Sequence, residues 1–508
     1  MSRSAPVVPA RPTVRLPSSA RPLPAARISR AVACGLLALA LALTACGGVH
    51  GTPGGSGVRD PYFPKAGNDG YDVTHYGLDL AYDPDDRHLG GTAEITARAE
   101  KDLSAFDLDL RGMDVEKVSV EGRAARWSRN GQELVVRPHD DLEEGETFRV
   151  TVRYSGTPQT ITDPDGSQEG WLPTDTGALA LGEPTGSMVW FPGNHHPSDK
   201  ASYDISVTVP EGLEAVSNGE LAQRTTRGGR TTFRWRTAEP MAGYVATLAI
   251  GDYDIARSTV TTTEEDLPVH TAVAPDQAGP ARKVLARIPE IMEWAEYNFG
   301  PYPFSSTGAI VAGEGDAEYA LETQNRPLFP GAPGTELLVH ELVHQWFGNS
   351  VTPKSWRDMW LNEGFATYAE WLWEEDNDGD SAQETFDALY EHGEDEHEDL
   401  WDFPPAKPSS AARISDSPVY ERGAMVLHKI RQKVGDDTFY DIVQGWAATH
   451  RHGNADTADF TSYVEKKAPD EDFTTVWKDW LYGDGRPGHP SRPATAGLSI
   501  RDDRRRPA

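Results

Sequence analysis

Two histidines and a glutamate in the second half of the sequence have the types and spacing of a metal site. The run that begins at His340 is His-Glu-Leu-Val-His, so His340 and His344 are four residues apart. On a helix this spacing directs both imidazoles from one face, where two neutral nitrogens can hold a zinc ion. Glu341 follows the first ligand, and its carboxylate can accept the proton of a metal-activated water. The same run also arises by chance on solvated helix faces, so the prediction needs a third ligand.

Glu363 supplies that third ligand. It lies in the run Leu-Asn-Glu-Gly-Phe within a second helical segment, 360–373, that is rich in Ala, Leu, Glu and aromatic residues. A helical hairpin would bring Glu363 over the two histidines. Two imidazoles and one carboxylate leave the fourth position of a tetrahedral zinc ion open for water, as in catalytic sites. We therefore predict one Zn²⁺ per chain and metal-assisted peptide hydrolysis, and we expect Asp358 and Asn362 to orient a zinc ligand.

The first 45 residues have the pattern of a secretion signal. Arg27 and Arg30 precede an apolar run over 31–45 that is too short to span a bilayer. The run ends in Leu-Thr-Ala-Cys-Gly, which resembles the lipobox of bacterial lipoproteins, whose Cys receives a diacylglyceryl group. We predict a lipoprotein signal peptide over 1–45, lipidation at Cys46 and a location on the extracellular face of the bacterial membrane. An ordinary cleaved signal, which gives a secreted protein, stays open.

The rest of the chain is strongly acidic. The 508 residues include 48 Lys+Arg and 79 Asp+Glu, a net charge of −31. Removal of 1–45 takes away six Arg and no acid, which leaves 42 basic and 79 acidic residues and a charge of −37. This charge excludes nucleic acid as a partner and electrostatic adhesion to anionic lipid, so membrane contact would come through Cys46. Since Cys46 is then the only cysteine, no disulfide forms within one chain.

Composition and periodicity divide the remainder into four segments. The Gly-rich stretch 46–65 is typical of a flexible tether. Over 66–257, apolar and polar residues alternate between turns rich in Gly, Asp and Pro, which predicts an antiparallel β domain. Over 258–487 helical spacing predominates, with a small sheet expected at 269–273 and 308–311. Residues 488–508 are rich in Pro and Arg without periodicity and are predicted to be disordered.

The second domain is predicted to hold several helices besides the two that carry metal ligands. Apolar residues have helical spacing over 284–299, and Pro289 should kink or split that helix. Further helices are expected at 380–392, 422–434 and 438–450. We therefore expect a multi-domain protein, with a β domain first and a mainly helical α+β catalytic domain second.

Together these motifs resemble a known family. The runs His340-Glu-Leu-Val-His-Gln-Trp-Phe-Gly-Asn and Trp360-Leu-Asn-Glu-Gly-Phe-Ala-Thr-Tyr look like those of the zinc aminopeptidases of the aminopeptidase N and leukotriene hydrolase type, which are gluzincin metallopeptidases. The similarity runs from about Tyr76 to Pro487, in a short form with a bacterial lipoprotein signal. The resemblance implies an N-terminal β saddle domain followed by a thermolysin-like catalytic domain, which agrees with the periodicity.

The resemblance also implies roles for residues outside the metal motif. Tyr319-Ala-Leu-Glu-Thr falls where the family has Gly-x-Met-Glu-Asn, and only the Glu is retained. In the family this Glu binds the α-ammonium of the substrate, so Glu322 is expected to do so, with Glu183 assisting and Ala320 beside the substrate. Tyr420, in Tyr-Glu-Arg-Gly, resembles the family tyrosine that steadies the oxyanion.

The expected function is the removal of residues, one at a time, from peptides with a free N-terminus. Zinc lowers the pKa of its bound water to about 7, and Glu341 takes the proton. Zinc and the Tyr420 hydroxyl then hold the oxyanion. Three alternatives stay open: an endopeptidase, which has no use for Glu322; a non-catalytic peptide-binding lipoprotein; and an epoxide-hydrolase side activity like that of the leukotriene enzyme.

The cover of the active-site mouth is a point on which this sequence departs from longer relatives. Members such as aminopeptidase N carry one or two domains beyond the catalytic one, whereas the resemblance here ends with the catalytic domain. We expect a monomer with a more open cleft, and a homodimer that shields the cleft stays open.

Overall fold

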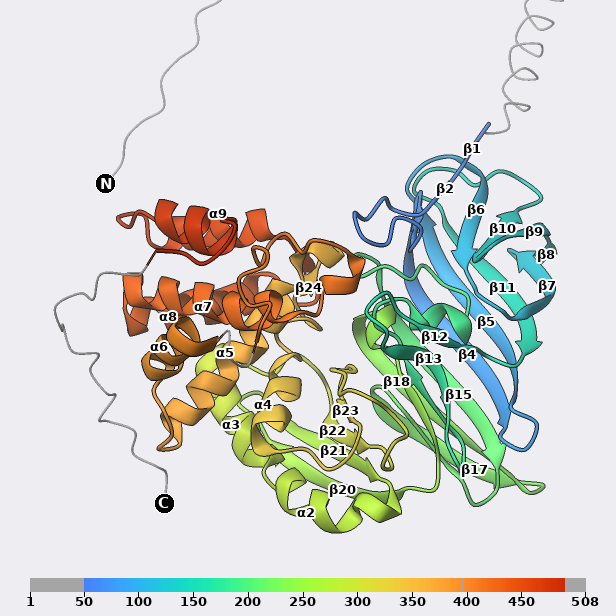
Figure 1. Cartoon of the computed structure of the whole chain (residues 1–508). Helices are drawn as coiled ribbons and strands as arrows, with labels where there is room; N and C mark the ends of the chain where they lie inside the picture. Colours follow the sequence, from blue (N-terminus) through green and yellow to red (C-terminus); the bar gives the residue numbers. More distant parts are fainter. Residues whose placement is uncertain (1–49, 394–396, 489–508) are drawn as a thin grey trace, which may run out of the picture. The chain divides into compact units, whose positions relative to one another are not determined.

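Strands form the first half of the chain and helices form most of the second (Figure 1). The computed structural model describes residues 50–393 and 397–488. The predicted signal peptide, Cys46 and the tail from residue 489 onward lie outside the described residues. Within the described part of the chain, no helix is both long enough and apolar enough to cross a membrane.

An eight-stranded sheet is the largest element of the first half, in the order β17-β18-β15-β4-β5-β11-β7-β8. Apolar and polar residues alternate along β4 and β5, so one face of each strand packs into the core. Adjacent strands are antiparallel except for β15 and β4, which run parallel; the expected fully antiparallel domain is wrong at this one pairing. Strands β5 to β14 lie between β4 and β15 in the chain. This long connection allows β15 to pair with β4 in the same direction. The strands are β4 (Tyr71–Asp83), β5 (His88–Ala99), β7 (Asp114–Val120), β8 (Arg123–Ala124), β11 (Thr147–Gly156), β15 (Lys200–Pro210), β17 (Glu220–Arg227) and β18 (Arg230–Ala242).

A five-stranded sheet supports the part of this β domain that approaches the predicted site. Its order is β12-β13-β14-β19-β16, and every residue of β14 and β19 is buried. It anchors the β12–β13 hairpin and the segment after β14 that contains Glu183. Its strands are β12 (Thr160–Thr162), β13 (Gln168–Pro173), β14 (Ala178–Leu181), β16 (Glu214–Ser217) and β19 (Leu248–Gly251). The other strands of this half are β1 (Thr52–Pro53), β6 (Leu103–Asp109), β9 (Arg126–Asn130) and β10 (Glu133–Arg137), in one sheet, and the pair β2 (Gly55–Ser56) and β3 (Asn68–Asp69).

A four-stranded sheet opens the second half, in the order β20-β21-β22-β23. Strands β21 and β22 pair in parallel and occupy the two segments predicted to form a small sheet, which confirms that prediction. The strands are β20 (Asp254–Thr261), β21 (Asp266–Val273), β22 (Thr307–Val311) and β23 (Leu328–Phe329). A separate short pair joins β24 (Thr352–Pro353) to β25 (Asn454–Ala455).

Helices make up the remainder of the second half. The helix expected over 284–299 is split, since α2 ends at Leu285 and α3 begins at Ile288, next to Pro289. Capping boxes start α6, with Ser381 and Glu384, and α9, with Asp456 and Asp459. The α-helices are α2 (Ala278–Leu285), α3 (Ile288–Phe299), α4 (Thr335–Val343), α5 (Trp360–Asp376), α6 (Ala382–His392), α7 (Ser417–Val434), α8 (Asp436–Thr449) and α9 (Thr457–Lys467). Short 3-10 helices are η1 (Gly186–Val189), η2 (Gly243–Val245), η3 (Pro275–Gln277), η4 (Trp356–Asp358) and η6 (Ala411–Arg413), and η7 (Val476–Leu481) is a π-helix.

The segment 50–65 is packed against the rest of the chain, so the prediction of a flexible tether over 46–65 is wrong for these residues. Asp60 is buried, and its Oδ2 atom accepts hydrogen bonds from Ser355 Oγ (2.8 Å) and Trp356 N (3.0 Å). Phe63 packs edge-on against Trp356, with 5.7 Å between ring centroids. Gly-rich composition predicted flexibility, but it could not reveal a buried carboxylate with partners about 295 residues away.

Asp60 connects three parts of the chain through one charge. Burial acts to raise its pKa, but hydrogen bonds from His196, Phe63, Tyr62 and Ser355 outweigh burial and lower the pKa to about 2. His196 belongs to the β domain, and Ser355 caps the 3-10 helix η4 that leads into α5. The segment 50–65 therefore helps to fix the start of α5.

We predict that Asp60→Ala lowers the free energy of unfolding by about 3 kcal/mol, because it removes a buried charge and leaves its donors without an acceptor. The folded-state pKa of Asp60 lies below its unfolded value, so this contribution is present above about pH 4 and is lost as the pH falls toward 2. Urea unfolding from pH 7 to pH 3 measures the difference between the two proteins. Asp79→Ala, at an exposed β4 position, is the control, and an Asp60→Ala effect no larger than the control effect would contradict the assignment.

Candidate active site

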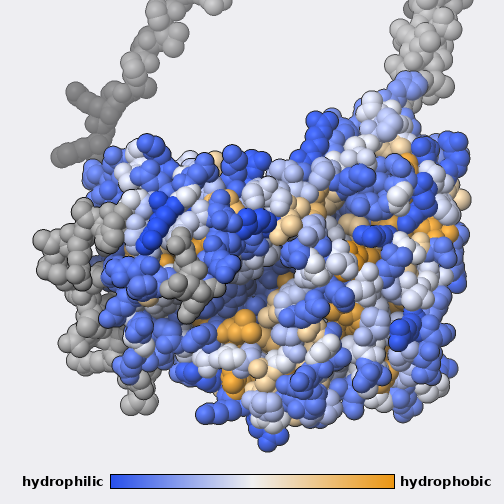
Figure 2. Space-filling model, viewed as in Figure 1, coloured by the Kyte–Doolittle hydropathy of each residue, from blue (hydrophilic) through white to orange (hydrophobic). Residues whose placement is uncertain are grey.

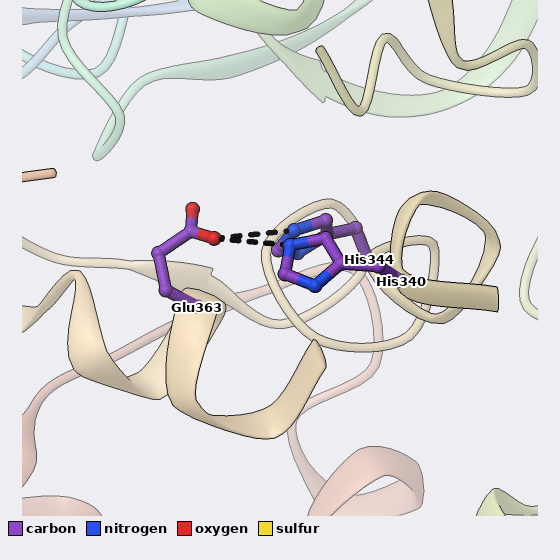
Figure 3. A group of neighbouring side chains, drawn as sticks. All are labelled: His340, His344 and Glu363. Carbon is purple, nitrogen blue, oxygen red and sulfur yellow. Dashed lines mark ion pairs between the residues drawn. The ribbon is translucent and has the colours of Figure 1, made fainter. Parts of the chain in front are cut away.

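Helices α4 and α5 bring the three predicted metal ligands together (Figure 3). His340 lies in the last turn of α4, and His344 directly follows that helix, one turn further on. Glu363 lies in the first turn of α5, where the partial positive charge of a helix N-terminus favours a carboxylate. Its Oε2 atom is 3.4 Å from His340 Nε2 and 3.4 Å from His344 Nε2.

These distances fit a tetrahedral zinc ion. Two ligand atoms that are each about 2.1 Å from a shared ion lie about 3.4 Å apart across a tetrahedral edge. The three ligand atoms lie within 4.8 Å of one another, and all three side chains are buried. On the far side of the rings, His340 Nδ1 bonds to Glu370 Oε1, and His344 Nδ1 is 3.1 Å from the carbonyl oxygen of Phe347. Such contacts fix the rings with both Nε2 atoms available to a metal.

Neighbouring carboxylates set the charge of the ligands. Burial acts to lower the pKa of His344, but Glu363 and Glu322 outweigh it and raise the pKa to about 9. The pKa of His340 is also raised, because its bonds to Glu363 and Glu370 outweigh burial. Burial acts to raise the pKa of Glu363, but the two histidines outweigh it and lower the pKa to about 2. This surplus of negative charge favours a bound cation, and protons compete with that cation at low pH.

Glu341 has the position of a proton carrier. It is 4% exposed, and its Oε2 atom has no hydrogen-bond partner in the described part of the chain. Burial raises the pKa of Glu341 to about 8, and His340 and His344 only partly oppose this shift. One ligand atom each from Glu341, Glu322 and His344 lies within 4.8 Å of the others. A carboxylate oxygen beside the metal ligands is thus available to take or give a proton.

Glu322 and Glu183 form an acidic cradle beside the metal ligands. One carboxylate oxygen of each, together with one from Glu363, lies within a group no wider than 4.8 Å. Burial raises the pKa of Glu322, with Glu363 adding to the shift and His344 opposing it. Burial also raises the pKa of Glu183, and Glu322 and Glu363 add to that shift. Carboxylates packed this closely repel one another, so a cation between them is strongly favoured.

The motif that carries the histidines also holds Glu322 in place. The carbonyl oxygen of Glu322 accepts hydrogen bonds from Asn349 Nδ2 at 2.6 Å and from Gln345 Nε2 at 3.4 Å. Its Oε1 atom accepts from Asn362 Nδ2 at 2.8 Å. Asn362 also donates to Glu363 Oε1 at 3.2 Å, as expected for a residue that orients a ligand.

Asp358, the other residue expected to orient a ligand, lies elsewhere. Its Oδ1 atom accepts hydrogen bonds from the backbone N–H (3.0 Å) and hydroxyl (2.6 Å) of Thr457, at the start of α9. The expectation for Asp358 is therefore wrong, because its carboxylate caps a helix instead of contacting a metal ligand. Glu370, which bonds to Nδ1 of His340, orients a metal ligand in place of Asp358.

A buried carboxylate fixes the segment that contains Glu183. Glu169 is fully buried, and its oxygens accept hydrogen bonds from Thr185 N (3.0 Å), Thr185 Oγ1 (2.8 Å) and Gly186 N (2.6 Å). A Cβ atom at Gly186 would lie 2.2 Å from the carbonyl oxygen of Leu181, so only glycine allows this close approach. The segment after β14 is thus held rigidly on the β domain.

Tyr420 reaches the site from helix α7. Its ring stacks on that of His340, with 6.1 Å between centroids and 11° between planes. Helices α5 and α7 approach closely at Gly364 and Gly423, where a Cβ on Gly364 would lie 2.9 Å from the backbone of Gly423. Burial raises the pKa of Tyr420, and Glu363 adds to the shift, so the hydroxyl keeps its proton and can donate a hydrogen bond.

The metal ligands, Glu341, the two cradle residues, Glu370 and Tyr420 line one cavity of about 400 Å³. Figure 2 shows the surface hollowed between the helices and the strands, with hydrophobic residues gathered at the rim. Within the described part of the chain, the cavity brings together every residue predicted to bind metal or substrate or to take part in catalysis: Glu183, Ala320, Glu322, His340, Glu341, His344, Glu363 and Tyr420. Cys46, the predicted lipidation site, lies outside the described residues.

Three supporting residues of the site were not predicted from the sequence. Gln345 and Asn349 lie within the histidine motif, and their amides could have been identified as candidates from that position alone. Glu370 follows Glu363 by seven residues, which is two helical turns, so both carboxylates lie on one face of α5. This spacing was the available signal for Glu370.

Comparisons with known proteins agree with this geometry. Residues 72–245 match the family model described as the Peptidase M1 N-terminal domain, and residues 332–480 match that of the Peptidase family M1 domain. The M1 zinc metallopeptidase of Deinococcus radiodurans is 30% identical, with a TM-score of 0.79 over 87% of this chain and 100% of that chain. A variant of it was crystallised with a Tyr-Ser-Ala substrate.

Curated relatives are longer. Probable aminopeptidase 1 of Saccharolobus solfataricus is 24% identical over 82% of this chain and 54% of its own length. Glutamyl aminopeptidase of Rattus norvegicus is 25% identical over 81% of this chain and 47% of its own length. The chain thus spans about half the length of the curated relatives it matches. With both M1 domain types matched and the metal-ligand geometry intact, this chain belongs to the M1 family of zinc metallopeptidases.

Proposed function

We propose that this protein is an aminopeptidase that removes single residues from peptides with a free N-terminus. One observation carries the proposal: Glu322 and Glu183 hold carboxylate oxygens within 4.8 Å of that of the metal ligand Glu363. A substrate ammonium between these carboxylates would be only one residue away from the carbonyl that faces the metal site. Because a cationic amine is the group that such a cradle stabilises, a chain with a free N-terminus is the favoured substrate.

The residues of the cavity can carry out the steps of hydrolysis. His340, His344 and Glu363 would hold a zinc ion, which would lower the pKa of a bound water to about 7 and polarise the carbonyl of the substrate. Glu341 takes the proton of the attacking water and then transfers it to the amine that leaves. The Tyr420 hydroxyl donates a hydrogen bond to the developing oxyanion, and one such donor commonly lowers the barrier by about 3 kcal/mol.

Related proteins support a peptide substrate. The Deinococcus radiodurans relative binds a tripeptide, and the curated relatives carry aminopeptidase names. An endopeptidase would use the same metal and Glu341 but would gain nothing from Glu322. A peptide-binding lipoprotein would need neither Glu341 nor Tyr420. The acidic cradle and the proton carrier together favour the aminopeptidase.

We predict cleavage of leucyl and alanyl amides with a free amine and no cleavage of their N-acetylated forms. Glu322→Gln should raise the KM for the free-amine substrates more than tenfold, because it removes one charge from the ammonium cradle. Glu341→Gln should lower kcat by about 10³-fold while the bound zinc, measured by elemental analysis, stays at one per chain. Steady-state kinetics with matched chromogenic amides provide both measurements.

Three outcomes of this assay would reject the proposal in different ways. Equal cleavage of free and acetylated substrates would assign an endopeptidase. Peptide binding without turnover would assign a binding protein. An unchanged KM in Glu322→Gln would remove Glu322 from the cradle. Glu239→Gln is a matched control, since Glu239 lies in strand β18 and does not line the cavity.

Glu370 supports the metal site through the ring of His340. The carboxylate bonds to Nδ1 of that ring, and its own side chain is only partly exposed. Loss of such a partner lets the ring rotate and makes its nitrogen a weaker ligand.

We predict that Glu370→Ala weakens zinc binding by about 10- to 100-fold, with little change in the unfolding temperature of the zinc-loaded protein. Competition with a chelator of known affinity measures the effect. Glu374→Ala, one turn further along α5 and outside the cavity, is the control. Equal zinc affinities for the Glu370→Ala and wild-type proteins would contradict the role of Glu370.

We further propose that the protein acts as a monomer, anchored by lipid at Cys46 on the extracellular face of a bacterial membrane. The support is the run of apolar residues that ends in Leu-Thr-Ala-Cys-Gly. The acidic charge of the chain makes direct adhesion to anionic lipid unfavourable, so an acyl chain is the means of attachment.

We predict that the full chain, expressed in a bacterium, incorporates an alkyne-labelled fatty acid and is found in the membrane fraction. Cys46→Ser should lose both the label and the membrane association, whereas Cys34→Ser should keep them. A wild-type protein without label, released into the medium, would indicate an ordinary cleaved signal.

A further inference from the structure

The hairpin between β12 and β13 brings a carboxylate of the β domain to the rim of the catalytic cavity. Asp165 and Ser167, in its turn, both line the cavity. Asp165 Oδ1 accepts hydrogen bonds from Ser167 N (2.9 Å) and Ser167 Oγ (2.7 Å), which fixes the turn. Gly166 between them has a φ of +99°, a conformation that favours glycine. The other oxygen, Oδ2, has no hydrogen-bond or ion-pair partner among the described residues.

This hairpin adjoins the wall beside the ammonium cradle. The backbone N–H of Gln168 donates to Glu318 Oε2 at 3.2 Å, directly before Tyr319 and Ala320. The Tyr319 hydroxyl is in turn 3.4 Å from the carbonyl oxygen of Glu183. Tyr319, Ala320 and the hairpin line the same cavity as Glu322 and Glu183, so they form a wall that the first side chain of a substrate held there can contact.

The cavity carries an excess of negative charge, and this charge affects which first side chain of a substrate it can accept. Six carboxylates line it, and none of the lining residues in the described part of the chain is Lys or Arg. Five of the six have a role already: Glu363 holds metal, Glu341 carries a proton, Glu370 orients His340, and the two cradle residues bind the ammonium. Asp165 is the one carboxylate among these six that has no role in metal binding, proton transfer or ammonium binding.

We propose that Asp165 makes this enzyme prefer peptides whose first residue is arginine or lysine. The proposal rests on the aminopeptidase function and names the substrate class of the same site. The apolar stem of a long basic side chain lies along Tyr319, Ala320 and Pro184, and its charged head meets Asp165 at the wetter rim. An acidic first side chain would be repelled by the same carboxylates.

The test compares arginyl with citrullyl amides, since citrulline has nearly the shape of arginine without its charge. The wild-type enzyme is expected to show a kcat/KM for the arginyl amide at least fivefold above that for the citrullyl amide. Asp165→Asn keeps the acceptor that fixes the turn but removes the charge, so it should lower this ratio by about fivefold, which is the upper end of a solvent-exposed ion pair. Leucyl amide turnover should stay within twofold, and 0.5 M NaCl should lower the wild-type ratio.

Asp86→Asn is a matched control. Asp86 is an exposed residue of the turn between β4 and β5, its Oδ1 atom accepts from the backbone N–H of His88 at 3.1 Å, and it does not line the cavity. The control is expected to leave the ratio of arginyl to citrullyl turnover unchanged.

The outcomes separate this proposal from the function on which it rests. If leucyl amide is cleaved but arginyl and citrullyl amides are equivalent, the preference is rejected and the aminopeptidase stands. If Asp165→Asn lowers leucyl and arginyl turnover equally, Asp165 has only a structural role and the proposal is overturned. If no free-amine substrate is cleaved, the proposed function itself fails.

Discussion

The mutual repulsion of carboxylates buried in one cavity is the constraint on which this active site depends. Glu322, Glu183 and Glu363 hold oxygens within 4.8 Å of one another, and no lysine or arginine among the described residues lines their cavity. Buried negative charges this close are stable only when cations lie among them or when protons neutralise them. The site therefore favours bound cations: a divalent metal at the histidines and, in the proposed function, the ammonium of a substrate next to it.

The scaffold keeps these charges close because several elements are fixed to one another by short contacts. Close approach of α5 and α7 at Gly364 and Gly423 sets the distance between Glu363 and the tyrosine on α7. On the β domain, Glu169 fixes the segment that presents Glu183. Lys200 joins the two halves, since its Nζ atom donates to the carbonyl oxygens of Asn349 and Ser350 just after the histidine motif, both at 2.9 Å. Repulsion within the site is thus resisted by hydrogen bonds and packing outside it.

Local signals in the sequence were sufficient for the metal ligands and for the order of β and helical domains. His340 and His344 are positioned by helical periodicity alone, and the split at Pro289 follows from the geometry of proline. The segment 50–65 shows where such signals fail. Its composition indicates flexibility, yet Asp60 is buried against residues about 295 positions later, and no local pattern encodes a contact of that range. The parallel pairing of β15 with β4 was not predicted for the same reason, because the two strands are far apart in the sequence.

The sequence by itself determined the type of chemistry, since two imidazoles on one helix face and a carboxylate in the next helical segment are the ligand types of a catalytic zinc site. Tertiary structure alone decided which carboxylates from other elements line the same cavity. Glu183 and Asp165 come from a different domain, and Asp358, although close to Glu363 in sequence, instead caps α9. The physical reason is that ligand spacing on one helix is a local property of the backbone. The distance between charges on separate elements depends on how side chains pack across the whole fold.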